Sequence, residues 1–257
     1  LRGAHINYSP LADENLAQQY KYLFPKIDAF HTVSKAIQNE GLKYGLKKNK
    51  SRVIYSAIEI NNKSKNNEEI NRPKLKLLSV GRPHWKKGYL YSLDACAHLK
   101  NEGIEFSYMI IGGLSEENYS HINDLDLEEH IVVKPHLNYY EIINEMEHSS
   151  LLILPSVEEG IANVVLEAMA CGLPVLSSNC GGMKEIITDG KNGFIFNRRD
   201  PIQISNKIKE FLSLSTNEIQ RLIINAEKVI KDNHNPNNYT KDFDLFYSKV
   251  IKGKPVG

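Results

Sequence analysis

Two glutamates, Glu159 and Glu167, are separated by seven residues directly after the apolar run 151–156. The run predicts a fully buried strand, and the segment after Gly160 predicts a helix that opens at the end of that strand. Free peptide amides at a helix N-terminus attract anions, and the small residues Gly160 and Ala162 let a ligand come close to the backbone. Glu159 precedes the helix and Glu167 lies one to two turns inside it, so both carboxylates can face one crevice. The pattern predicts a site that holds hydroxyl groups with its acids and phosphate groups with its amides; a helix with two surface charges is the alternative.

A second group of candidate residues follows the predicted strand 75–80. Glycines flank a loop that carries Arg82 and Lys87 at another strand-to-helix junction. A guanidinium can hold phosphate oxygens through two donors, and a lysine adds a point charge. The spacing matches neither a Walker A loop nor GxGxxG. The loop therefore predicts a phosphate contact through Arg82 and Lys87, or an ordinary basic turn in which Trp85 packs the loop.

The elements that must position these residues alternate between strand and helix. Expected strands lie at 75–80, 106–111, 131–133, 151–156, 175–177 and 194–196, and expected helices lie at 88–100, 138–147, 160–171 and over most of the chain after 201. This βαβ rhythm predicts an open parallel sheet with helices on both faces. Ligands of such sheets bind outside the carboxyl ends of the strands, where both groups of candidate residues fall.

Composition and breakers divide the chain into four parts. Residues 1–62 carry a short α/β pattern in which Ser34 is expected to cap a helix, and 63–73 belong to a polar, asparagine-rich linker. Residues 74–235 form the main α/β domain. Residues 236–257 form a last helix and tail, which Pro236 is expected to separate from the preceding helix.

The bulk composition excludes several classes of protein. Apolar content of 41% and charged content of 25% over 257 residues are typical of a globular protein. A net charge of +1 and the lack of a nucleic-acid-reading motif argue against a nucleic-acid partner. No apolar stretch approaches the about 20 residues of a membrane span, and no secretory signal is expected. Three cysteines without CxxC spacing favour a reduced, cytoplasmic compartment, and nine scattered histidines predict no metal site.

Taken in order, these elements resemble glycosyltransferase family 4 over roughly residues 75–196. The resemblance is carried by Gly81-Arg82 with Lys87-Gly88, Glu159 with Glu167, Gly172-Leu173-Pro174-Val175, and Gly181-Gly182 with Glu185. It implies an α/β protein of the GT-B type, in which two Rossmann-like domains with doubly wound parallel sheets face a cleft. Residues 1–62 would then be a remnant of the N-terminal, acceptor-side Rossmann-like domain, since this second domain is usually much longer in the family. A missing N-terminal piece is expected.

The resemblance also implies an activity, namely a retaining glycosyltransferase of the hexosyltransferase type. The enzyme would move a sugar from a nucleoside-diphosphate sugar to a carbohydrate or lipid-linked glycan acceptor, without a metal or another cofactor. Arg82 and Lys87 would hold the donor diphosphate, and Glu159 would lie near the transferred sugar. Arg2 stands where the family carries a histidine that faces the sugar, which makes it a fourth candidate catalytic residue.

The same resemblance implies a set of donor contacts. They are Gly81, Arg82, Lys87, Pro135, His136, Glu159, Gly160, Ile161, Ala162, Asn163, Val164 and Glu167. Glu167 would accept from the ribose hydroxyls, and Pro135 and His136 would lie beside the base. Ile161 and Ala162 stand where the family more often has phenylalanine and glycine, a change that should leave the backbone contacts intact.

The same residues also fit two alternative functions, and they suggest where the protein acts. An incomplete first domain and the departure at Arg2 fit a nucleotide-sugar-binding module without catalytic activity, and a GT-B nucleotide-sugar epimerase would share the fold. Polysaccharide biosynthesis in the cytoplasm is the expectation at the level of the family. The basic run 47–52 fits peripheral contact with anionic lipid at the inner face of a membrane, or a solvated turn.

Overall fold

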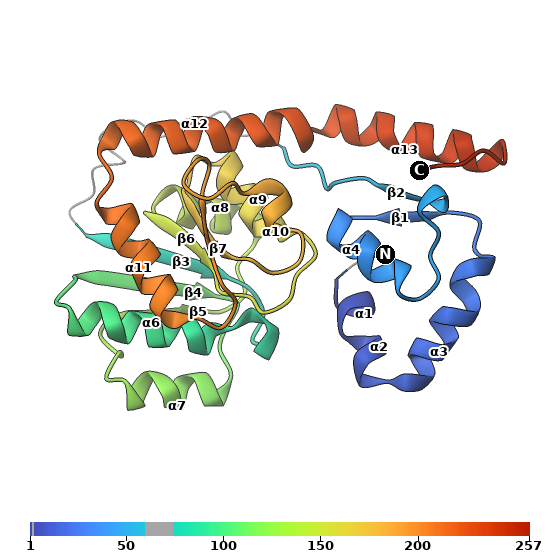
Figure 1. Cartoon of the computed structure of the whole chain (residues 1–257). Coiled ribbons are helices and arrows are strands. Elements are labelled where there is room, and N and C mark those ends of the chain that lie inside the picture. Colours follow the sequence, from blue (N-terminus) through green and yellow to red (C-terminus); the bar gives the residue numbers. More distant parts are fainter. Residues whose placement is uncertain (2, 60–73) are drawn as a thin grey trace.

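A computed structural model describes residues 1, 3–59 and 74–257, which form two α/β lobes (Figure 1). The predicted linker 63–73 and the candidate residue Arg2 lie outside the described residues. The N-terminal lobe contains helices α1 to α4 and strands β1 and β2. The C-terminal lobe runs from β3 to α12, and the last helix, α13, returns to the N-terminal lobe (Figure 1).

The C-terminal lobe is built on a parallel sheet of six strands. These are β3 (Leu75–Val80), β4 (Phe106–Ile111), β5 (Ile131–Lys134), β6 (Leu151–Leu154), β7 (Val175–Ser178) and β8 (Phe194–Phe196). They lie in the order β5-β4-β3-β6-β7-β8. This is the strand order of a doubly wound dinucleotide-binding sheet, in which the order reverses between the first and fourth strands and leaves a crevice at their carboxyl ends. The predicted fold class is confirmed, and the crevice lies between β3 and β6.

Helices cover both faces of this sheet. They are α6 (Tyr89–Asn101), α7 (Glu116–Asp124), α8 (Tyr139–Glu147), α9 (Asn163–Ala170), α10 (Met183–Ile186), α11 (Pro201–Leu212) and α12 (Thr216–Asn233). Side chains alternate between the faces along each strand, so Leu77 joins the core beneath α6 and α11 while Leu78 joins the core beneath α9 and α12. Helix α7 was not predicted, because only Asn118 and Ile122 of its nine residues are buried and its apolar period is weak.

The N-terminal lobe is smaller, with two parallel strands, β1 (Phe30–Thr32) and β2 (Ser51–Val53). Its helices and 3-10 turns are α1 (Ala4–Asn7), α2 (Ser9–Ala12), α3 (Glu14–Leu23), η1 (Phe24–Lys26), α4 (Lys35–Leu42) and η2 (Lys48–Lys50). The predicted cap at Ser34 is confirmed, since its hydroxyl accepts a hydrogen bond from the amide of Ile37. Phe24, Phe30 and Ile37 centre a separate core.

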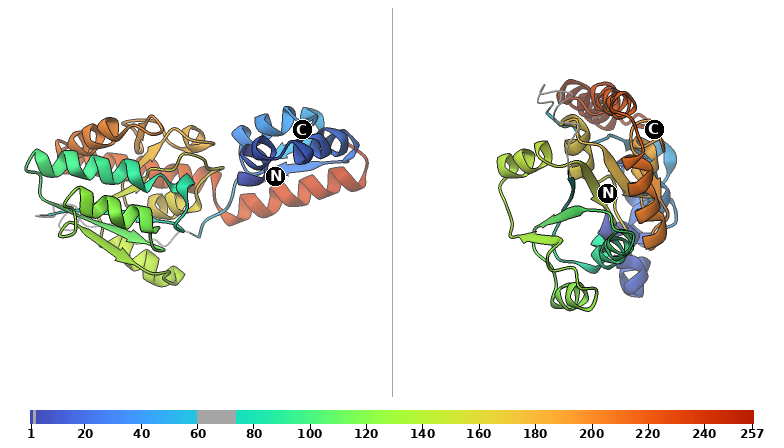
Figure 2. Two further views of the ribbon diagram at one scale, coloured as in Figure 1. Left: turned by 90° about the horizontal axis from the view of Figure 1, so that it is seen from below. Right: turned by 90° about the vertical axis from the view of Figure 1, so that its left-hand side faces the viewer.

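Helix α13 (Pro236–Ile251) joins the two lobes. Helices α12 and α13 follow each other along one side of the molecule, α12 over the C-terminal lobe and α13 over the N-terminal lobe (Figures 1 and 2). Phe246 packs with Ile54 and Val256 in a core of its own. Pro236 separates α12 from a last helix, as expected, and it is itself the first residue of α13. Proline is tolerated there, and Asn235 caps the helix.

No helix in the described part of the chain is both long enough and apolar enough to cross a lipid bilayer. The side chains of Cys96, Cys171 and Cys180 are buried, and no disulfide joins them.

Candidate functional site

The two groups of candidate residues meet at the crevice. The loop after β3 and the loop after β6 are in contact, because the amide of Val157 donates to the carbonyl of Lys86 at 2.7 Å. Gly88 makes this approach possible: its φ is +68°, and a Cβ at this position would lie 2.1 Å from the carbonyl oxygen of Pro155. Only glycine fits both the backbone angle and the space. Residues 81–88 and 155–162 therefore form one surface at the carboxyl edge.

An ion pair lies at the centre of this surface. Lys87 Nζ is 2.7 Å from Oε1 of Glu159, and both side chains are largely buried, at 24% and 19% exposed. The hydroxyl of Ser156 donates to the same oxygen at 3.1 Å. Within the described residues, Oε2 of Glu159 has no hydrogen-bond partner. The pair thus presents an ammonium for an anion and a carboxylate oxygen for a hydroxyl.

Arg82 and Gly81 lie at the end of β3 beside this pair. Lys87 folds back over Gly81, where a Cβ would come within 2.9 Å of Lys87 Cε. Arg82 is exposed and forms no ion pair within the described part of the chain. Its guanidinium is therefore available to an anion at the mouth of the crevice.

Helix α9 begins later than the sequence predicted. Residues 160–162 form a bend, and the helix starts at Asn163 because Ala162 is extended, with φ −79° and ψ 114°. Alanine has no side-chain acceptor to cap a helix. The amides of Asn163 and Val164 have no acceptor within the described residues. An uncapped N-terminus beside the ammonium of Lys87 makes this end of the crevice favourable to phosphate.

Gly160 and Ile161 make a different contact from the one predicted. A Cβ on Gly160 would lie 3.3 Å from Val33 and 3.6 Å from Ile37. The small size of Gly160 therefore admits the N-terminal lobe rather than a ligand over its α-carbon. The side chains of Ile161 and Val164 pack against the core, which leaves their peptide groups for any ligand contact.

Glu167 is the fifth residue of α9, one turn inside the helix as predicted. Its side chain is half-buried, and burial raises the pKa of the carboxyl above its usual value. Burial also raises the pKa of Tyr139, and the charge of Glu167 adds to that effect. Glu167 thus lies near the start of α8.

Pro135 and His136 follow β5, two strands away from β3. Both are exposed at the same carboxyl edge of the sheet. The described residues include no hydrogen bond that joins them to Lys87 or Glu159. The structure therefore brings Lys87, Glu159 and the start of α9 together and leaves Pro135 and His136 at the far end of the crevice.

Residues that the sequence did not single out connect the N-terminal lobe to this surface. The side-chain Nδ2 of Asn7 donates to the backbone carbonyl of Glu159 at 3.3 Å and to Oε2 of Glu158 at 3.4 Å. Arg198 pairs with Oε1 of Glu158 at 2.6 Å. These partners are far apart in the chain, so no local pattern could have indicated them.

Glu185 makes the second connection between the lobes. Its carboxylate accepts from the amides of Lys35 at 2.9 Å and Ala36 at 2.8 Å, which open α4, and from the hydroxyl of Tyr55 at 2.9 Å. Burial is the largest cause that raises the pKa of Tyr55, and the hydrogen bond to Glu185 is the next. Glu185 belonged to the recognised motif, but its partners on the other lobe were not predicted.

No group of three or more histidine, cysteine, aspartate or glutamate side chains in the described ranges could hold a metal ion. The expectation of a reaction without a metal remains a prediction.

Comparisons with known proteins identify the family of the chain. A family model described as "Glycosyl transferases group 1" matches residues 60–229. WcaL of Escherichia coli K12, named as a colanic acid biosynthesis glycosyltransferase, is 26% identical over 225 residues, which are 84% of this chain and 55% of WcaL. AmsK of Erwinia amylovora, an amylovoran biosynthesis glycosyltransferase, is 31% identical over 202 residues, with 75% of this chain and 49% of AmsK covered. The chain spans about half the length of the curated relatives it matches.

A solved structure is similar over most of the chain. HepE of Anabaena, determined in complex with UDP and glucose, superposes with a TM-score of 0.82 at 20% sequence identity, covering 93% of this chain and 68% of HepE. At this identity the likeness concerns the fold.

Proposed function

Because the chain belongs to the family Glycosyl transferases group 1, we propose that it transfers a sugar from a nucleoside-diphosphate sugar to an acceptor hydroxyl. The observation that carries this proposal is the Lys87–Glu159 ion pair beside the uncapped N-terminus of α9. This arrangement offers an ammonium and free amides to a diphosphate, and a carboxylate oxygen to a sugar hydroxyl.

In the proposed reaction the donor diphosphate binds Lys87, Arg82 and the amides of Asn163 and Val164. As the bond to the sugar breaks, negative charge grows on the diphosphate, and groups already oriented toward it stabilise that charge. Lys87 then exchanges part of its contact with Glu159 for the phosphate. These cationic and dipolar groups take the place of a metal.

Glu159 orients the transferred sugar in this proposal. Lys87 and Ser156 hold Oε1, so Oε2 is left to accept a hydrogen bond from a sugar hydroxyl. With its charge engaged in this way, Glu159 is a poor nucleophile, so no covalent sugar–enzyme bond is proposed. Retention then requires the acceptor hydroxyl to attack on the face from which the diphosphate leaves, with its proton passing to the departing phosphate oxygen. A hexose is the expected sugar.

The nucleoside lies further along the crevice. Glu167 accepts hydrogen bonds from the ribose, and Pro135 and His136 lie beside the base. The complex of HepE with UDP makes uracil the first base to test. The names of WcaL and AmsK support a carbohydrate or lipid-linked glycan as the acceptor, in polysaccharide biosynthesis.

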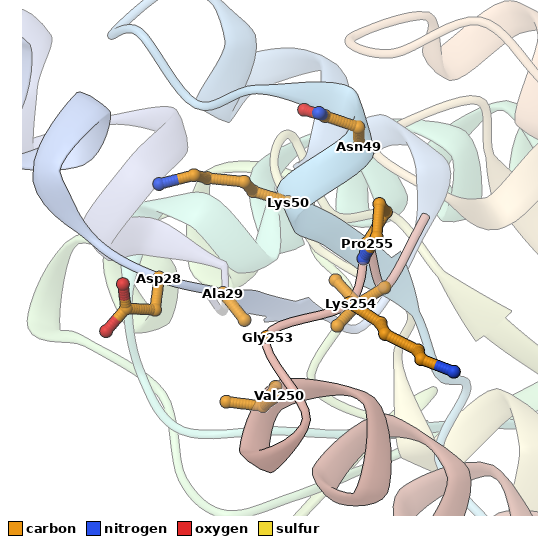
Figure 3. Close-up of a pocket in the computed structure, with 9 residues that line it drawn as sticks. Asp28, Ala29, Asn49, Lys50, Val250, Gly253, Lys254 and Pro255 are labelled. Atoms are coloured by element: carbon orange, nitrogen blue, oxygen red, sulfur yellow. The ribbon is translucent and has the colours of Figure 1, made fainter.

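The proposed location is the cytoplasm, with peripheral contact to an anionic membrane. The buried cysteines, which no disulfide joins, support a reducing compartment. The amides of Val256 and Gly257 donate to the carbonyl of Asn49, which brings the tail after α13 to the turn before β2. Lys50 and Lys254 thereby line one pocket of about 290 Å³ (Figure 3).

Lys47 and Lys48, both exposed, extend the charge of this pocket. Arg52 does not contribute, because it pairs with Asp242 at 2.5 Å. A patch of this kind should bind vesicles that contain an anionic lipid at low salt and release them at high salt. The variant Lys48→Glu/Lys254→Glu should bind them less; equal binding of both proteins, or none by either, would reject the membrane contact.

Calorimetric titration with UDP, GDP and their hexose conjugates tests the proposed donor. One of these should bind, and Arg82→Ala should weaken binding about tenfold or more, since a hydrogen bond to a charged group contributes about 1.5–3 kcal/mol. Lys184→Ala, at an exposed position on α10, is the matched control. Absence of binding to every nucleotide would overturn the proposal. Formation of a glycosylated product by the full-length enzyme separates transfer from binding alone and from epimerisation.

A further inference from the structure

An exposed aromatic pair lies across the seam between the lobes. Trp85 belongs to the 3-10 turn η3 (Trp85–Lys87) after β3, and Tyr8 lies between α1 and α2. Their ring centroids are 5.2 Å apart at an interplanar angle of 64°. Trp85 is nevertheless 51% exposed and Tyr8 39% exposed. Trp85 therefore does not simply pack its own loop; it presents an open aromatic surface beside Tyr8.

This pair is directly linked to the ion pair of the crevice. Lys86 Nζ lies 4.3 Å from the centre of the Tyr8 ring and 5.6 Å from that of Trp85. The next residue is Lys87, which binds Glu159. On the other side, Asn7 precedes Tyr8 and donates to the carbonyl of Glu159. The aromatic pair is thus attached at both ends to the site of proposed sugar transfer.

A pocket of about 460 Å³ opens between the two lobes, and Asn7, which precedes Tyr8 in the chain, lines it. Its size is in the range of small-molecule sites, about 300–1,000 Å³. Polar side chains dominate its lining: Asn7, Asn39, Lys43, Glu158, Asn179 and Arg198. Amides, carboxylates and cations of this kind can donate to and accept from several hydroxyl groups at once.

The strand order places this pocket away from the proposed base contacts. The proposed base and phosphate contacts follow β5, β3 and β6. The pocket is lined instead by Glu158, Asn179 and Arg198, which follow β6, β7 and β8, and by helices of the N-terminal lobe. Glu159 lies between the two regions. A ligand in the pocket would therefore approach the transferred sugar from the side away from the nucleotide.

We propose that Tyr8 and Trp85 form a platform for a pyranose ring of the acceptor glycan, whose hydroxyls are held in the adjoining interlobe pocket. A pyranose has an apolar C–H face that packs on an aromatic ring and a rim of hydroxyls that needs polar partners, and the pair and the pocket supply these two surfaces. This inference rests on the proposed function for the identity of the ligand as an acceptor. Binding of a glycan at this place is measurable without turnover.

Trp85 is the only tryptophan of the chain, so its fluorescence reports on this surface alone. The protein is titrated with a panel of neutral oligosaccharides of glucose, galactose and mannose, and separately with UDP and UDP-glucose. We expect a saturable change in Trp85 emission with at least one oligosaccharide, which persists when UDP is bound. Saturation-transfer NMR should show the contact at the ring C–H protons of the sugar.

Variants separate a platform from a contact that only joins the lobes. Tyr8→Ala should weaken oligosaccharide binding about three- to tenfold, whereas Tyr8→Phe, which keeps the ring, should bind within about twofold of the wild type. Tyr119→Ala removes a similarly exposed tyrosine, 47% exposed on α7, and should change nothing. Tyr8→Ala should affect oligosaccharide affinity more than UDP affinity.

Two results would overturn the platform. One is a Trp85 emission that no oligosaccharide changes; the other is a response to UDP or UDP-glucose to which oligosaccharides add nothing, which would assign the surface to the donor. If an oligosaccharide changes the Trp85 emission but neither UDP, GDP nor their hexose conjugates bind, the proposed donor is wrong and the glycan site stands.

Discussion

Replacing Glu185 with alanine tests what holds the two lobes together. The carboxylate accepts from the amides of Lys35 and Ala36 at the start of α4 and from the hydroxyl of Tyr55. A hydrogen bond to a charged group contributes about 1.5–3 kcal/mol, and a carboxylate at a helix N-terminus adds about 0.3–1 kcal/mol. Because Lys35 is exposed, water can replace the carboxylate as the acceptor of its amide, which reduces the loss of stability. We therefore expect Glu185→Ala to cost about 2–4 kcal/mol, below the sum of the separate contacts.

The assay uses the position of Trp85. Because its ring contacts Tyr8 on the other lobe, its emission should change when the lobes separate. In urea, the transition followed by Trp85 should move to a lower midpoint in Glu185→Ala, and the transition followed by far-UV circular dichroism should move less. Lys184→Ala, on the same short helix, should stay within about 0.5 kcal/mol of the wild type.

A double-mutant cycle identifies the contact itself. Tyr55→Phe removes one donor to the Glu185 carboxylate, and the two substitutions should show a coupling of about 1 kcal/mol. Coincident Trp85 transitions in Glu185→Ala and the wild type would refute the reasoning, because the lobes would then dock without this carboxylate.

Three further predictions concern the crevice. Gly88→Ala should lower the free energy of unfolding, measured in urea, by more than about 3 kcal/mol, because the new Cβ would lie 2.1 Å from the Pro155 carbonyl oxygen. Gly190→Ala, with a similar φ of +71° and nothing within 4 Å of its Cβ, should lower it by only about 1–2 kcal/mol. Equal losses would contradict the crowding at Gly88. Glu167→Gln should weaken nucleotide binding yet leave the protein at least as stable at neutral pH. Burial raises the pKa of Glu167, so the folded protein keeps a proton that the unfolded chain loses near the usual 4.5. The stability that this proton contributes is full below pH 4.5 and is lost as the pH rises through the raised pKa. If the stability of Glu167→Gln depends on pH as the wild type's does, burial does not raise the pKa of Glu167. Glu159→Ala should abolish transfer by the full-length enzyme in a product assay, and near-normal turnover would remove Glu159 from the mechanism.

Much of the fold followed from local residue types. Strands β3, β4 and β8 have the predicted bounds, because each is an apolar run between breakers that only a buried strand accommodates. The predicted start of α9 was too early, since the small residues Gly160 and Ala162 fit a bend as well as a helix. Helix α7 was missed because a mostly exposed helix needs little apolar periodicity.

The candidate site, like the fold, was predictable in part from the sequence. Lys87, Glu159 and Glu167 were found from their types, their spacing and their place after predicted strands. Their arrangement depends on β3 and β6 being neighbours, although β4 and β5 lie between them in the sequence. The spacing of residues along a chain determines backbone geometry within a few turns; it carries no measure of which strands pair.

Contacts between the lobes were decided by the tertiary structure alone. Asn7 lies 152 residues from Glu159, and the amide of Ala36 lies 149 residues from its acceptor Glu185. Each of these side chains would also be ordinary in a solvated loop. The sequence determined which groups were available for the proposed phosphate and sugar contacts. Packing of the two lobes determined which of these groups face one another, because hydrogen bonds and ring contacts depend on a few ångströms of distance in space and not on separation along the chain.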